Sequence, residues 1–267
     1  MAKVVTDTKH YIAIADALRE KTGDTLLLKP SEMATEVEKV YDAGKTKEWS
    51  DFWDEYLMKG TRQTFYAAFY GAGWNDKTFK PKYVIKPVNA QGMFNSSKIT
   101  TIPKDAKGAS MVQMPTTCTN MDYMFQGSTI KSIDFNIYGI SCQKMTATFK
   151  NALELESIRM IDARGCTFID TFLNTPKLKE VRFFKENSVN AYIAENINFK
   201  WSPLLSKESI VDIVDALYEK TTGKTLTLSQ VAVNNAFETS TGSADGSTSS
   251  EWLSLTQKRP TWTISLV

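Results

Sequence analysis

The stretch TNMDYMFQGSTIKSIDF, residues 119–135, decides the expected fold. A methionine–phenylalanine pair is followed, five residues later, by the pattern apolar-x-x-apolar-x-apolar. Alternate side chains of an extended strand point to the same face, so Ile133 and Phe135 are expected to face a core while Ser132 and Asp134 face solvent. The stretch therefore predicts a turn followed by a short, half-buried strand.

The same pattern recurs along the chain, which indicates stacked structural repeats. Four phenylalanines, at positions 94, 125, 149 and 172, are separated by 31, 24 and 23 residues; the last three are followed by the complete apolar pattern and the first by a partial copy. A unit of about 24 residues cannot bury its apolar face alone, so several units must stack. We predict parallel strands near 99–102, 130–135, 155–160 and 178–183. Two buried columns are expected to run along the stack, one of Ile133, Ile158 and Val181 and one of Phe125, Phe149 and Phe172.

The three cysteines keep the same period. Cys118, Cys142 and Cys166 are spaced by 24 residues. An odd number of cysteines argues against a disulfide framework, and the chain has no C-x-x-C pair and only one histidine, His10, to form a metal site. We expect buried, reduced thiols and no metal.

Segments of different character flank the repeats. Apolar residues at three- and four-residue steps predict N-terminal helices within residues 1–60, one of them near 31–59, and residues 61–88 read as a loop-rich connector. An insertion at 103–118, with two prolines, lengthens the first period. After the repeats we expect a strand at 196–199, a helix capped by Ser206 and running to about Lys220, a further helical turn near Trp252, and a strand at 261–267.

An aromatic stripe on the helix near 31–59 has two interpretations. It either packs on its own domain, as most amphipathic helices do, or anchors a neighbouring subunit, since aromatic residues are favoured in interface cores. The candidate assembly residues are Trp49, Phe52, Trp53 and Tyr56.

The composition excludes several classes of function. The chain has 267 residues with 32 basic and 30 acidic side chains, a net charge of +2, and no long stretch of one sign, so we expect no nucleic-acid or membrane partner. Residues 1–20 lack the continuous apolar stretch of a secretory signal, and no run is long enough to span a membrane. We expect synthesis in a bacterial cytoplasm.

Residues 119–135 resemble the T-N-M-x-x-M-F unit of BspA-like leucine-rich repeats, which occur in bacterial surface proteins and in particle proteins of phages that infect Firmicutes. Residues 14–23, IADALREKTG, and residues 225–267 resemble the two ends of phage structural proteins. The resemblance implies an α+β chain: a short leucine-rich-repeat-like β-solenoid over 89–199, flanked by the N-terminal helices and by a C-terminal α/β cap over 200–267.

The resemblance also implies a function. We expect a non-enzymatic virion protein of the tail, baseplate or fibre, with other virion proteins and further copies of itself as partners, no cofactor and an adhesive surface. The alternatives are a dedicated receptor-binding adhesin and, less favoured, a glycan-degrading tail enzyme, for which no catalytic motif is found. Solvent-facing Asp134, Arg159 and Arg182 form one column on the expected sheet. Guanidinium groups suit carboxylates and phosphates, so this column could bind a host cell-surface polymer or simply increase solubility.

Overall fold

The computed structural model describes residues 65–71, 75–76, 79–81, 83–138, 144–185, 193–237 and 245–267. The chain divides into two compact units, residues 1–60 and residues 61–267, and every described residue belongs to the second. The expected N-terminal helices therefore lie outside the described residues. The same holds for the candidate assembly residues Trp49, Phe52, Trp53 and Tyr56.

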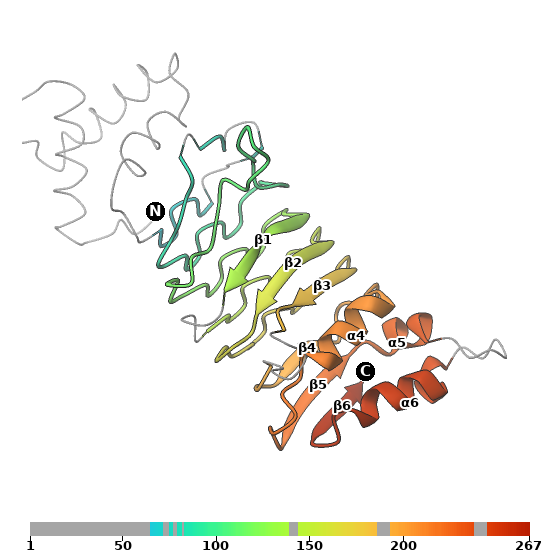
Figure 1. The fold of residues 1–267 in the computed structure, drawn as a ribbon. Coiled ribbons are helices and arrows are strands. Elements are labelled where there is room, and N and C mark those ends of the chain that lie inside the picture. The colour runs from blue at the N-terminus through green and yellow to red at the C-terminus, as the bar shows by residue number, and fades with distance from the viewer. Residues whose placement is uncertain are drawn as a thin grey trace, which may run out of the picture. The chain divides into compact units, whose positions relative to one another are not determined.

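Three short strands form the first sheet. β1 (Ser132–Tyr138), β2 (Ser157–Asp162) and β3 (Glu180–Phe183) pair in parallel in that order and lie side by side in Figure 1. Ile133 is in register with Ile158, and Ile158 with Val181, and all three side chains are buried. The predicted aliphatic column is confirmed, although β1 and β2 begin and end two or three residues later than expected, and β3 begins two later.

The expected strand at 99–102 does not form: the Thr100 carbonyl accepts the N–H of Lys131 at 2.8 Å, but two N–H groups of this segment are bonded elsewhere. The N–H groups of Thr100 and Thr101 donate to one carboxylate oxygen of Asp76, at 2.7 and 3.2 Å. Pro103 follows and has no N–H to offer a neighbouring strand. The sequence here partly matches the strand pattern, but the repeat does not predict that the Asp76 carboxylate binds these two N–H groups.

A column of phenylalanine rings runs beside the first sheet. Phe94, Phe125, Phe149 and Phe172 stack in sequence order, with ring centroids 5.3 to 5.9 Å apart, and all are buried. The column extends in both directions, from Phe69 to Phe199. The predicted stacking of Phe125, Phe149 and Phe172 is confirmed.

Each phenylalanine of this column before Phe199 lies at the centre of a turn segment, and the backbones of successive turns are hydrogen-bonded. The N–H of Phe94 donates to the carbonyl of Met124 at 2.8 Å, and the N–H of Phe125 to the carbonyl of Thr148 at 2.8 Å. The residues two before and two after each phenylalanine have positive φ angles, a conformation that favours Gly and Asn. They are Ala67, Gly71, Gly92, Ser96, Tyr123, Gly127, Ala147, Asn151, Asp170 and Asn174.

A second parallel sheet is formed by β4 (Ile197–Phe199), β5 (Lys224–Leu228) and β6 (Trp262–Leu266), in that order. The helices α4 (Lys207–Asp215), α5 (Gln230–Ala236) and α6 (Ser250–Gln257), with the short 3-10 turn η2 (Gly246–Thr248), lie together on one side of it (Figure 1). The strands expected at 196–199 and 261–267 and the helix near Trp252 are confirmed. Ser206 caps α4 as expected, but α4 ends at Asp215 rather than near Lys220, because Leu217 and Tyr218 pair with Ile193.

The predicted single β-solenoid is wrong: the described residues form two separate three-stranded parallel sheets with helices, a mixed α/β arrangement. The first sheet ends at β3 because α4, and not another strand, packs against its edge. Ser209 Oγ accepts the N–H of Val181 at 3.1 Å, and Asp212 Oδ2 accepts the N–H of Phe183 at 2.6 Å. The phenylalanine column nevertheless continues into the second sheet, because Phe199 of β4 stacks on Phe172 with ring centroids 4.3 Å apart.

Candidate functional site

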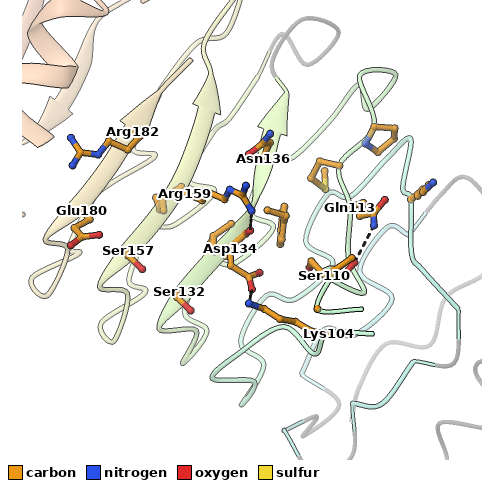
Figure 2. A pocket seen from close by; sticks show the side chains of 18 residues that line it. Lys104, Ser110, Gln113, Ser132, Asp134, Asn136, Ser157, Arg159, Glu180 and Arg182 are labelled. Carbon is orange, nitrogen blue, oxygen red and sulfur yellow. Dashed lines mark hydrogen bonds and ion pairs between the residues drawn. The ribbon is translucent and has the colours of Figure 1, made fainter. Parts of the chain in front are cut away.

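A groove of about 750 Å³ lies over the polar face of the first sheet. Its floor is formed by all three strands, and its wall by residues 104–115 (Figure 2). Asp134, Arg159 and Arg182, predicted from sequence to share one solvent-facing column, all line it. The structure therefore brings the three surface candidates together on β1, β2 and β3.

The wall is built by the insertion that lengthens the first repeat period. Asp105 Oδ1 accepts the N–H groups of Lys107 and Ala109, both at 2.8 Å, which tightens the tip of the segment. The N–H of Gln113 donates to the carbonyl of Ile85 at 2.9 Å and fixes its far end. These bonds hold the wall beside β1.

Two irregularities of pairing shape the floor. Between Ile133 and Asn136, β1 has two residues where β2 has only Arg159. Between Ile158 and Ile161, β2 again has two residues where β3 has only Arg182. Such β-bulges re-aim side chains and bend a strand. Both bulges therefore occur at the positions of the charged residues Asp134, Arg159 and Arg182.

The charges in the groove are only partly paired. Lys104 Nζ lies 2.8 Å from Asp134 Oδ2, and Arg159 Nη1 donates to the Asp134 backbone carbonyl at 3.2 Å. Arg182 forms no salt bridge with any described residue, although its charge interacts with the Glu208 carboxylate of α4. The lining holds four basic side chains (Lys86, Lys104, Arg159, Arg182) and two acidic ones (Asp134, Glu180), so its net charge is +2.

Asp134 has unused hydrogen-bonding capacity. Its Oδ1 is shielded from solvent and has no donor within the described part of the chain. The side chain as a whole is 30% exposed, and its other oxygen, Oδ2, pairs with Lys104. Buried polar atoms are almost always satisfied, and an exception points to a missing donor or to a functional role.

A smaller hollow of about 330 Å³ shares Arg182 and lies beside α4. Its other two basic side chains are already neutralised: Lys185 lies 2.7 Å from Asp212, and Lys207 lies 2.6 Å from Glu251. The larger groove is therefore the better candidate site.

Comparisons with protein-family models, with curated proteins and with solved structures find no match. The resemblance to BspA-like repeats and to phage proteins stays an expectation.

Within the described residues there is no cluster of three or more His, Cys, Asp or Glu that could hold a metal ion, and no helix long and apolar enough to cross a membrane. Cys118 and Cys166 are buried and form no disulfide. Cys142 lies outside the described residues.

Sequence reasoning missed the wall of the groove. Lys104, Ser110 and Gln113 belong to no repeat position, so the apolar pattern did not mark them. The signal that could have found them is the insertion itself: extra residues beside an exposed strand face form a projecting loop, and binding sites are often built on such loops.

Proposed function

We propose that the protein is a non-enzymatic structural component of a phage particle, in the tail, baseplate or fibre, and that the groove is its adhesive face. The groove carries the proposal: it is a positively charged hollow, with two arginines that form no salt bridge within the described residues, on the exposed side of a sheet whose other side is buried. Surface charges that only increase solubility do not need a wall beside them. The resemblance of residues 14–23, 119–135 and 225–267 to phage proteins supports the particle location.

The sheet is a rigid support for such a face. Ile133, Ile158 and Val181 pack its back into the core, and the adjoining phenylalanine column is fully buried. Interiors are packed as densely as organic crystals and deform little. The guanidinium groups of Arg159 and Arg182 therefore extend from fixed backbone positions, which lowers the entropic cost of binding.

Assembly partners are proposed to be other virion proteins and further copies of this chain, held through the stripe of Trp49, Phe52, Trp53 and Tyr56. Replacing these four residues with Ala in the full chain should leave a soluble protein that is no longer incorporated into particles. Incorporation at the wild-type level would place the anchor elsewhere.

A dedicated receptor-binding adhesin is the second candidate, and the same groove favours it. The two candidates differ in what happens when the protein is missing. Particles of normal shape that fail to adsorb would support a dedicated adhesin, whereas incomplete particles would support a structural component.

Competition tests the adhesive role directly. Purified chain added in excess should block adsorption of the parent particle to its host, because it occupies the same surface groups. The Arg159→Ala/Arg182→Ala variant should not block adsorption. A soluble chain that neither binds the host nor competes would contradict the proposal.

A further inference from the structure

We infer that the groove binds an acidic polysaccharide, a sugar chain with carboxylates and free hydroxyls, in preference to a polyphosphate. This inference names the ligand of the proposed adhesive face and so rests on that function. It is carried by three features of the lining: cations for carboxylates, acids that limit the charge density of the ligand, and neutral polar groups for hydroxyls.

Two arginines of the floor provide the positive charges that would bind carboxylates. Among the described residues, Arg159 donates one hydrogen bond, from Nη1 to the Asp134 backbone carbonyl, and Arg182 forms no salt bridge. A guanidinium has five N–H donors in a planar fork that fits a carboxylate in a bidentate way. Neighbouring strands lie about 4.8 Å apart, so the two arginines offer adjacent anion positions on a path that crosses the strands.

The acids set an upper limit to the charge that the groove tolerates. Asp134 and Glu180 lie among the same lining residues, on the strands that flank β2. Like charges at short range repel one another, most strongly where water is partly excluded. The charges of a polyphosphate follow one another more closely than the carboxylates of an acidic polysaccharide, so a polyphosphate brings more negative charge against both carboxylates.

The hydroxyls of a sugar find partners along the floor and the wall. Ser132, Ser157 and Asn136 on the strands, with Ser110 and Gln113 on the wall, supply donors and acceptors. A sugar hydroxyl can both donate to and accept from these groups, whereas a fully ionised phosphodiester has no proton to donate.

Three polymers separate the chemistry. The full chain is titrated by calorimetry with polygalacturonate, with methyl-esterified polygalacturonate and with inorganic polyphosphate. Polygalacturonate should bind. The ester should not, because it keeps the hydroxyls and loses the charge. Polyphosphate should bind at least tenfold more weakly than polygalacturonate, because the two carboxylates repel it.

Variants assign the effect to the groove. Arg159→Ala/Arg182→Ala should weaken polygalacturonate binding roughly tenfold or more, because it removes both charged donors for the carboxylates. Asp134→Asn/Glu180→Gln should gain affinity for polyphosphate, because it removes the repulsion. Lys98→Ala/Lys220→Ala removes two exposed positive charges outside the groove and should change neither affinity.

The outcomes are distinct from those of the competition experiment. Equal binding of polyphosphate and polygalacturonate, or equal binding of the ester, would overturn the acidic-polysaccharide inference while leaving an adhesive groove in place. Binding of none of the three would also overturn it if the chain still competes with particles. Failure of competition, by contrast, would overturn the proposed function.

Discussion

Asp212 of α4 accepts the backbone N–H of Phe183 at 2.6 Å, and its other carboxylate oxygen lies 2.7 Å from Lys185 Nζ. Phe183 is the last residue of β3, at the edge of the first sheet. A side chain of a helix thus satisfies the backbone group that another strand would have taken. This contact is the physical reason why the first sheet has three strands.

Asp212→Ala should destabilise the chain by about 1–3 kcal/mol, because it leaves a buried N–H without an acceptor. Urea unfolding followed by circular dichroism measures the loss. Asp215→Ala on the same helix is the matched control. Among the described residues its carboxylate pairs with the half-exposed Lys258, 3.3 Å away, and surface pairs contribute about 0–1 kcal/mol. Equal effects of the two variants would contradict this account of the sheet edge.

The sequence predicted the periodic part of this fold and failed where the period ends. Phe125, Phe149 and Phe172 repeat at nearly constant spacing, so their stacking followed from the need to bury each unit against the next. Ser209 and Asp212 belong to α4, which is not part of the repeat pattern. Their bonds to β3 depend on tertiary packing, which local patterns do not encode, and the sequence therefore suggested a continuous solenoid where the chain forms two sheets.

Phe149 stacks between Phe125 and Phe172 and is completely buried. Phe149→Ala should cost about 3–5 kcal/mol, the usual range for a fully buried phenylalanine, because it opens a cavity and interrupts the column. Thermal and denaturant unfolding give the value. Ile169→Ala, at a side chain that is 63% exposed, should stay within about 0.5 kcal/mol. A cost for Phe149→Ala below that of the control would mean that the column does not carry the core.

Asp162 ends β2 with its side chain 1% exposed, and Arg164 neutralises it. Arg164 Nε and Nη2 donate to the carboxylate at 2.9 and 2.6 Å. Arg164→Ala should cost about 3–5 kcal/mol, since it leaves a buried charge unpaired.

Two further variants check this ion pair. Arg164→Lys should recover only part of the stability, because an ammonium cannot form the planar double contact. The Asp162→Ala/Arg164→Ala double variant should be more stable than Arg164→Ala alone, as measured by a double-mutant cycle. A double variant less stable than the single one would refute this account of the pair.

Asp76 makes the stability of the folded chain depend on pH in the acidic range. Burial raises its pKa, but hydrogen bonds from the Thr100 hydroxyl and from the N–H groups of Thr100 and Thr101 outweigh burial, so the pKa lies below the ordinary 3.8. A carboxyl whose pKa is lowered by folding stabilises the chain above its unfolded pKa, and this contribution is lost as the pH falls through the folded pKa. Asp76→Asn should therefore lower stability at pH 7 and reduce its decline below about pH 4. An unchanged acid limb of the stability curve would contradict this role.

The candidate site was predictable in its floor and not in its wall. Alternation along three similar strands placed Asp134, Arg159 and Arg182 on one exposed face, and they do share one groove. Lys104 and Gln113 reach that groove only because the insertion folds back beside β1, and neither its length nor its prolines specify that direction.

The central claim is that the groove binds the host surface through its arginines, and adsorption of particles carrying Arg159→Ala/Arg182→Ala tests it most directly. Adsorption is measured at several salt concentrations, beside particles carrying Lys98→Ala/Lys220→Ala and after checking that both variants unfold at the wild-type midpoint. The arginine variant should adsorb roughly tenfold more weakly or worse and lose its dependence on salt, because the screened charge pairs are gone. Wild-type adsorption with unchanged salt dependence would contradict the claim.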